Sequence, residues 1–257
     1  MVYVARHDKT TQLYLRPLDQ LEAKPLAGTE GADTASPFFS PDGEWIGFKH
    51  NFTLNKVSSQ GGPPATVSGI PGGGGATWSE DGNIILSRGP GAKLVEVAAA
   101  GGTPRPLMEP EHGTGHEFYR WPQALPRGAV LFNSSTGSTW DQARIEVFSE
   151  KTGERRVLLE GGTCPRYVAP GYIVFQRDAQ LMAAPFDLKS LKITGEPAPT
   201  FVHLRTDPST GAAQFTIAKN GTLAYVPGGP VTPQSRLAWV DSKGNETRFR
   251  RLPKPTV

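Results

Sequence analysis

Cysteine is almost missing from this chain of 257 residues, and long apolar runs are missing altogether. The single cysteine, Cys164, cannot form a disulfide within the chain, so cysteine usage does not indicate a redox compartment. Apolar runs reach only about five residues, far short of a transmembrane helix. Residues 1–6 lack the basic start and apolar stretch of a signal peptide. These absences predict a soluble segment that does not insert into a membrane.

A strong charge of one sign is also missing. There are 27 Lys and Arg against 24 Asp and Glu, which gives a net charge of +3 and a pI near 9.0. Basic residues are spread along the chain except for one group, Arg248, Arg250, Arg251 and Lys254. Nucleic-acid binding needs basic side chains gathered in a stripe. We interpret the group as the solvated side of an outer strand and predict no nucleic-acid partner.

Contiguous catalytic motifs are absent as well. No Gly-x-Ser-x-Gly nucleophile elbow and no kinase signature occurs. The glycine run from Pro71 to Gly75 is not followed by a helical pattern that could aim backbone amides at a phosphate. We therefore predict that the chain is not an enzyme and needs no cofactor.

What the chain does have is a degenerate turn that occurs five times. Its copies are SPDG at 40–43, SEDG at 79–82, LPRG at 125–128, VAPG at 168–171 and AKNG at 218–221. The closing glycines follow one another at intervals of 39, 46, 43 and 50 residues. Short strands repeated at roughly 40–50 residues are typical of a β-propeller.

Alternating apolar residues follow each turn, as antiparallel strands with two different faces require. The pairs are Ile46/Phe48, Ile84/Leu86, Val130/Phe132, Ile173/Phe175 and Leu223/Tyr225. The pattern predicts an all-β fold, a six-bladed β-propeller in one domain over 1–257. The approximate blades are 1–31, 32–70, 71–110, 111–162, 163–207 and 208–257.

The first blade is predicted to be incomplete, because there are six sets of second to fourth strands but five first strands. The chain opens with Val2–Arg6, Gln12–Arg16 and Lys24–Leu26. We expect a gap or a foreign contact beside Val2–Arg6, where exposed backbone donors invite pairing. A second copy of the chain is one candidate for that edge, which would give a homo-oligomer.

Recognition residues are expected on the face that carries the inter-blade loops, since these are the longest and least repetitive segments. The candidate ligand-binding residues are His112, His116, Trp140, Asp141, Arg166 and Asp207. For Trp140, an exposed anchor and a plug packed against a neighbouring blade are equally supported. Two histidines four apart share a face only on a helix, so His112 and His116 are interpreted as loop residues and no metal site is predicted. Cys164 is interpreted as a buried structural thiol.

Residues 40–48, SPDGEWIGF, resemble the TolB-type PD40 propeller repeat. Residues 13–19 together with 37–43, and residues 94–104 and 120–123, are similar to the propeller region of membrane-anchored bacterial serine/threonine protein kinases. The resemblance covers nearly the whole chain. It implies a parent protein with a kinase domain, a membrane span and an extracytoplasmic or periplasmic propeller.

From these patterns we predict a non-catalytic binding or sensor module that recognises a protein, a peptide or a small ligand at the loop-rich mouth of the channel. Two alternatives stay open. One is the gating propeller of a prolyl-oligopeptidase-type hydrolase, and the other is a metal-dependent propeller enzyme. A kinase upstream, a Gly-x-Ser-x-Gly domain downstream, or metal lost on replacing His112 and His116 would separate the three.

Overall fold

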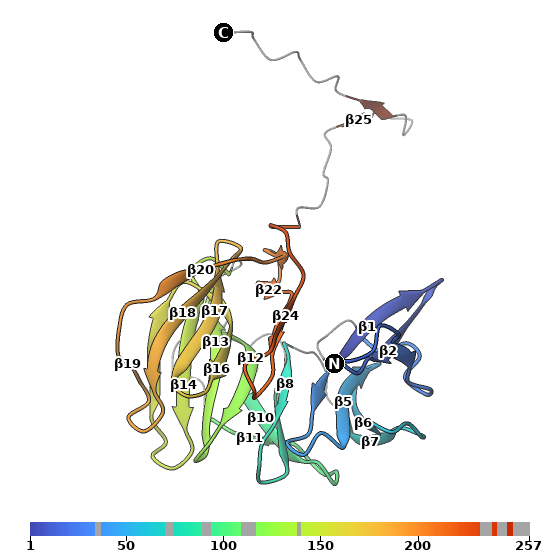
Figure 1. The fold of residues 1–257 in the computed structure, drawn as a ribbon, viewed down its shortest axis with the longest axis horizontal. Coiled ribbons are helices and arrows are strands. Elements are labelled where there is room, and N and C mark those ends of the chain that lie inside the picture. Colours follow the sequence, from blue (N-terminus) through green and yellow to red (C-terminus); the bar gives the residue numbers. More distant parts are fainter. Residues whose placement is uncertain are drawn as a thin grey trace.

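Small antiparallel sheets make up the computed structural model, which describes residues 1–33, 37–69, 74–88, 94–108, 117–137, 140–231, 238–240 and 246–248 (Figure 1). Every regular element in this part of the chain is a strand. None of the described segments forms a helix long and apolar enough to cross a membrane. The prediction of an all-β fold is confirmed.

The first sheet has three strands and the next three sheets have four each. The first contains β1 (Val2–His7), β2 (Thr10–Leu15) and β3 (Lys24–Pro25). The second contains β4 (Phe38–Phe39), β5 (Trp45–His50), β6 (Thr53–Ser58) and β7 (Ala65–Gly69). The third contains β8 (Ala76–Trp78), β9 (Asn83–Ser87), β10 (Leu94–Ala98) and β11 (Arg105–Pro106). The fourth contains β12 (Phe118–Leu125), β13 (Ala129–Ser135), β14 (Arg144–Ser149) and β15 (Arg155–Glu160).

The fifth sheet and three short ladders complete the chain. The fifth sheet contains β16 (Thr163–Val168), β17 (Tyr172–Arg177), β18 (Gln180–Asp187), β19 (Lys192–Ile193) and β20 (Ala198–His203). The ladders pair β21 (Thr206–Asp207) with β22 (Ala212–Ala213), β23 (Phe215–Ile217) with β24 (Leu223–Tyr225), and β25 (Ala238–Val240) with β26 (Glu246–Arg248).

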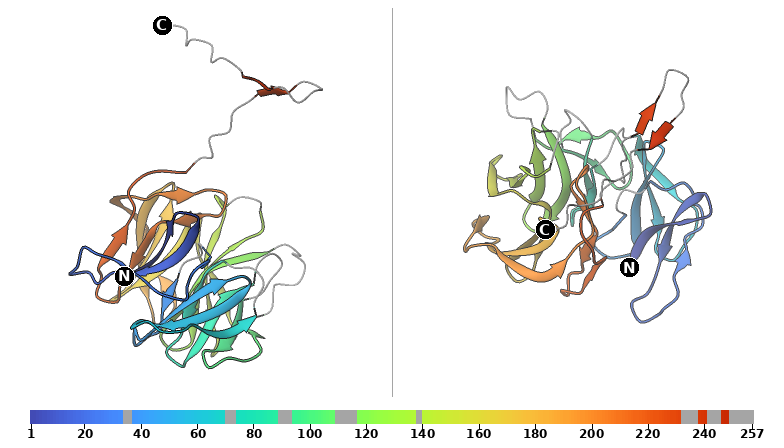
Figure 2. Two further views of the ribbon diagram at one scale, coloured as in Figure 1. Left: turned by 90° about the vertical axis from the view of Figure 1, so that its right-hand side faces the viewer. Right: turned by 90° about the horizontal axis from the view of Figure 1, so that it is seen from above.

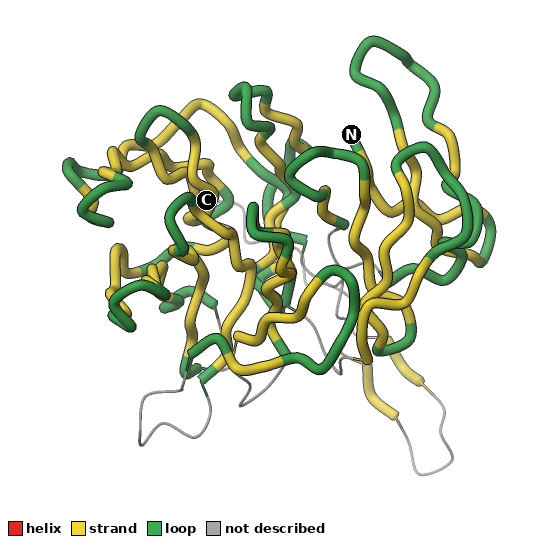
Figure 3. The backbone as a smooth tube through the Cα atoms, turned by 90° about the horizontal axis from the view of Figure 1, so that it is seen from below, coloured by secondary structure: helices red, strands yellow, loops and turns green. Residues whose placement is uncertain are grey.

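The five sheets are arranged as the blades of a propeller (Figure 2). The first two ladders, β21–β22 and β23–β24, lie between the fifth sheet and the N-terminal sheet. Seen from below, green loops and turns join the yellow strands at the ends of the sheets (Figure 3). The propeller prediction is therefore confirmed, with five blades found.

The blades hold together by burying facing sheets against one another. The predicted period-two pairs point into these inter-blade cores: Ile46, Ile84, Leu86, Val130, Phe132, Ile173 and Phe175 are completely buried, and Phe48 is 2% exposed. Each core joins two successive blades, for example Leu131 and Val147 of the fourth with Phe175 and Phe186 of the fifth. A single blade could not hide these side chains alone.

A repeated hydrogen bond also links the innermost strands. Thr77 Oγ1 accepts from the backbone N–H of Ala124 at 3.2 Å, and Gln123 Oε1 accepts from that of Tyr167 at 2.7 Å. Both acceptors occupy the same position in their repeats, five residues before the closing glycine. These bonds fix the height of one innermost strand relative to the next, which aligns the residues at the mouth of the channel.

Two predicted features differ from the structure. The expected sixth blade is seen in the described residues only as separate two-stranded ladders, and Tyr225 of β24 is 44% exposed to the solvent among these residues. The turn at Gly171 also departs from the others. The closing glycines at 43, 82, 128 and 221 have φ between 70° and 86°, whereas the fourth turn, at 168–171, contains a cis Ala169–Pro170 bond.

The incomplete first blade is as predicted. Its sheet order is β1–β2–β3, so β1 pairs with β2 and has no second neighbour among the strands that the structure describes. The side of β1 that faces away from β2 is therefore an open edge in the described part of the chain.

Candidate functional site

A left-handed backbone position recurs where the innermost strands begin, at the loop-rich mouth of the channel. Gly75, Trp121 and Cys164 have φ of 98°, 49° and 54°, and each stands seven residues before the closing glycine of its repeat. In β12 and β16 the pairing register shifts at this point, which marks a β-bulge. A non-glycine residue held there costs about 1–3 kcal/mol, and bulges re-aim side chains at functional positions.

The bulge in β12 turns Trp121 onto Trp140 from the loop between β13 and β14. The two rings meet edge to face with centroids 5.5 Å apart, and the residues are only 7% and 8% exposed. Gly211 makes room for this pair, since a Cβ there would lie 2.7 Å from Cγ of Trp140. Trp140 is therefore a packed plug, the second of its two interpretations.

Arg120 covers the tryptophan pair and connects it to the β21–β22 hairpin. Its guanidinium carbon lies 4.9 Å from the ring centroid of Trp140 and 5.6 Å from that of Trp121. Its Nη1 donates to the carbonyl oxygen of Thr210 at 3.2 Å. This cation–π contact joins the fourth blade to a segment 90 residues further along the chain.

Arg166 lies beside this cluster, in the middle of β16. Its Nη1 donates to the carbonyl oxygens of Pro165 at 2.8 Å and Trp121 at 3.4 Å. Burial lowers the pKa of Arg166 and also that of Arg120. Within the described ranges neither guanidinium forms an ion pair with a carboxylate, so both retain N–H donors without a carboxylate partner in hydrogen-bond range.

Asp207 lies on the hairpin that Arg120 reaches, but its carboxylate is used by its own turn. It accepts from the Ser209 backbone N–H at 2.9 Å, the Ser209 hydroxyl at 2.6 Å and the Thr210 hydroxyl at 3.0 Å. The bond from the Ser209 hydroxyl is the main cause of the lowered pKa of Asp207. Its charge acts on Arg120 through space.

Asp141 faces a different space from its neighbour Trp140. It lines a polar groove of about 410 Å³ at the outer end of the fourth blade, together with Ser134, Gln142 and Glu160. The structure thus brings Trp140, Arg166 and Asp207 together around Trp121 and Arg120, and places Asp141 outside them. His112 and His116 lie outside the described residues.

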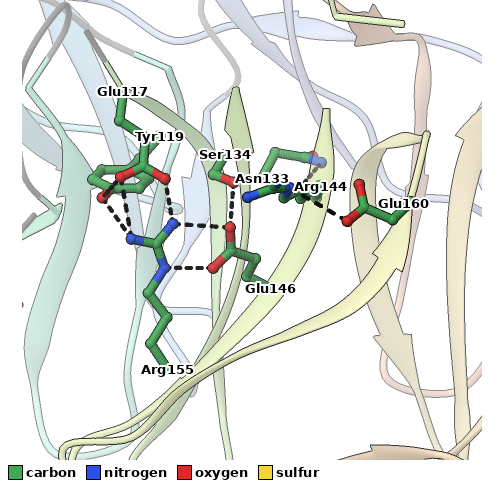
Figure 4. A network of polar contacts seen from close by, with 8 residues as sticks. All are labelled: Glu117, Tyr119, Asn133, Ser134, Arg144, Glu146, Arg155 and Glu160. Carbon is green, nitrogen blue, oxygen red and sulfur yellow. Dashed lines mark hydrogen bonds and ion pairs between the residues drawn. The ribbon is translucent and has the colours of Figure 1, made fainter. Parts of the chain in front are cut away.

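A buried ion network connects the start of β12 to β14 and β15 of the same blade (Figure 4). Arg155 of β15 bridges Glu117, which precedes β12, and Glu146 of β14. The side chains are 14%, 6% and 1% exposed, and Glu146 also accepts from Ser134. Burial alone would raise the pKa of Glu117, but hydrogen bonds from Arg155 and Tyr119 outweigh it and lower that pKa. Burial and the bond to Glu117 raise the pKa of Tyr119.

Burial disfavours the reactive thiolate form of Cys164. It is buried, and burial raises the pKa of its thiol to about 11, so the thiolate is scarce. Its Sγ lies 3.5 Å from the carbonyl oxygen of Gly211. In the part of the chain that the structure describes, no group of three or more His, Cys, Asp or Glu could hold a metal ion.

Arg120 and Trp121 are the residues that sequence reasoning missed. A signal for them exists, because Gly75, Trp121 and Cys164 share one offset from the closing glycine. From the sequence alone, nothing shows that the residue at this offset lies in a β-bulge.

No protein-family model and no curated protein matches the sequence. Solved structures do match. The chain is similar to a putative TolB from Agrobacterium tumefaciens (TM-score 0.58, 17% identity, 76% of each chain). It is also similar to an oligogalacturonate lyase in complex with manganese (TM-score 0.60, 16% identity, 88% of this chain and 73% of that one). A third is the calcium-binding protein regucalcin from A. tumefaciens (TM-score 0.57, 15% identity, 83% and 72%).

These similarities establish the class of the molecule as a β-propeller with TolB-like neighbours. They also correct one prediction. The inference that the chain is not an enzyme was wrong, because enzymes such as the lyase share this fold. A propeller gathers residues from different blades at its channel, so a catalytic site there need not leave a contiguous motif.

Proposed function

We propose that this chain is a ligand-recognition propeller that binds a protein, peptide or small molecule at the loop-rich mouth of its channel. The observation that carries the proposal is the pair of guanidiniums, Arg120 and Arg166, whose hydrogen bonds within the described part of the chain go to carbonyl oxygens. A ligand with a carboxylate or another strong oxygen acceptor would complete their hydrogen bonding.

The rigid surroundings of these arginines support the same proposal. Two tryptophan rings and a neighbouring blade hold Arg120 and Arg166 in place before any ligand arrives. Preorganised donors lose little conformational freedom on binding. The bulges at Trp121 and Cys164 add backbone strain at the same place, which is where functional residues concentrate.

The finer proposal concerns the parent protein. The similarity of residues 13–19, 37–43, 94–104 and 120–123 to kinase-linked propellers supports an extracytoplasmic sensor that transmits binding to a kinase domain. The sequence flanking this chain in its parent gene tests this directly. A kinase domain and a membrane span upstream would support it, and a hydrolase domain downstream would contradict it.

The binding site itself is tested by protein-observed NMR with a library of carboxylate- and phosphate-bearing fragments. The indole N–H signals of Trp121 and Trp140 serve as reporters, because Arg120 contacts both rings. We expect bound fragments to shift these signals in the wild type and much less in Arg120→Gln and Arg166→Gln. Fragments that leave both signals unmoved, or that shift the variants equally, would contradict the site.

A further inference from the structure

The opposite end of the propeller carries a second surface that the mouth does not use. A groove of about 400 Å³ lies between the fourth and fifth blades, where their turns come together. Its apolar floor includes Val147 of β14 and Leu191 of the turn between β18 and β19, at the end of the inter-blade core. We call this space the basic groove because its charged lining is mainly cationic.

Four cations and one carboxylate line the basic groove: Arg127, Lys151, Arg156, Lys189 and Glu154. Glu154 is the partner of Arg156, whose Nη2 lies 3.5 Å from its carboxylate. The other three cations are exposed, and none of them has an ion pair in the described ranges. The groove therefore presents a rim of net positive charge around an apolar floor.

The walls of the basic groove are fixed rather than loose. Arg156 donates to the carbonyl oxygens of Ser190 at 3.0 Å and Leu191 at 3.3 Å, which joins the two blades across the groove. The carboxylate of Asp187 accepts from the backbone of Lys189 and the hydroxyl of Ser190, so it is turned onto its own loop. Its charge shapes the turn and also interacts through space with Lys189.

We propose that the basic groove binds an acidic peptide segment of a protein partner, with an apolar side chain on the floor and carboxylates at the rim. The volume lies near the lower end of the range for small binding sites, which suits a few residues of one chain. A nucleic acid would need a longer track of basic contacts than four cations offer. The basic groove is independent of the proposed function, since the mouth lies at the other ends of β12 and β16.

The test uses the acetylated pentapeptide EELEE, labelled with fluorescein, and fluorescence anisotropy with the whole chain. We expect saturable binding that weakens with added salt, and a loss of at least tenfold in affinity in Arg127→Glu/Lys189→Glu. The matched control is Lys9→Glu/Lys24→Glu, which makes the same charge change at exposed positions in the first blade. It should keep the affinity within twofold.

Each other outcome counts against the proposal. The proposal is contradicted if EELEE does not bind or if both double variants lose affinity equally. It is also contradicted if EEGEE, which lacks the apolar side chain, binds as tightly as EELEE. If free glutarate competes with EELEE for the basic groove as well as the unlabelled peptide does, the ligand is a small anion and the peptide proposal is wrong. Arg120→Gln should bind EELEE normally, so failure at the mouth and failure in the basic groove are told apart. Thermal unfolding of each variant confirms that it is folded.

Discussion

At the scale of single residues, the mouth depends on positions where only glycine fits. Gly211 has φ of 68° and touches Trp140, whereas Gly43 has φ of 76° and no atom within 4 Å of the place that a Cβ would occupy. The two residues therefore share the backbone cost of a side chain and differ only in the space for it. They form a natural pair for measuring how tightly the tryptophan plug is packed.

We expect Gly211→Ala to lower the free energy of unfolding by about 1–3 kcal/mol more than Gly43→Ala, because the added methyl group overpacks Trp140. Urea denaturation measures the difference. The tryptophan emission spectrum should change in the first variant only, as Trp140 moves from Trp121. Equal losses in the two variants would show that Trp140 moves to accommodate the added methyl group at little cost in free energy.

Glu117 gives a pH-dependent prediction at the same scale. Its pKa in the folded protein is lower than the ordinary value of 4.5. A lowered folded-state pKa stabilises the protein above the unfolded pKa, and this stability is lost as the pH falls through the folded value. We expect Glu117→Gln to cost about 1–3 kcal/mol at neutral pH, because Arg155 loses one of its two charged partners.

The measurement is the free energy of unfolding at about pH 7 and about pH 3, with the wild type losing more over this interval than Glu117→Gln. Glu160→Gln is the control, because its ion pair with Arg144 is largely exposed and contributes little. Parallel pH profiles for the wild type and Glu117→Gln would show that Glu117 does not link protonation to folding.

At the scale of elements, the inter-blade hydrogen bonds make a clear prediction. Gln123→Ala leaves the backbone N–H of Tyr167 without its acceptor, and we expect a loss of about 1–3 kcal/mol in the free energy of unfolding. Gln123→Glu keeps an acceptor oxygen in place and should recover part of that loss. Denaturant unfolding of the two variants is the measurement, and equal losses would contradict a role for this bond.

The same scale shows why the sequence predicted the blades better than the site. Ile84 and Leu86 alternate with a period that depends only on neighbouring residues, so their burial could be read directly. The mouth depends on a register shift between β12 and β13, which is a property of two strands together. Arg120 and Trp121 therefore could not be predicted from the sequence, whereas Arg166, a predicted candidate, lies beside them in the structure.

Asp207 illustrates the second reason. It falls in a segment predicted as a loop, which the structure shows to contain β21, and its hydrogen bonds with Ser209 and Thr210 are a local turn geometry. The exposure of Tyr225 gives a third reason. The spacing of the fifth glycine matches the other repeats, yet whether a blade is covered depends on a neighbouring sheet.

At the scale of the whole molecule, β1 is the edge strand of the first blade and pairs only with β2 among the described strands. Met1 and Arg16 exchange both backbone hydrogen bonds, at 2.7 and 2.8 Å. In an antiparallel ladder such pairs alternate, so Tyr3 and Ala5 bond to β2 and the N–H of Val4 points to the open side. A long apolar edge strand of this kind readily accepts another strand.

We expect this edge to pair with the same edge of a second copy of the chain. Two proline substitutions in β1 distinguish an effect on association from an effect on stability. Val4→Pro removes an N–H from the open side and should leave the chain monomeric at concentrations where the wild type associates. Ala5→Pro removes a bond to β2 and should instead lower stability. Sedimentation velocity over a range of concentrations measures the mass of each. A wild type whose mass does not change with concentration, or a Val4→Pro variant that associates equally well, would show that β1 is protected in the intact propeller by something other than a second copy.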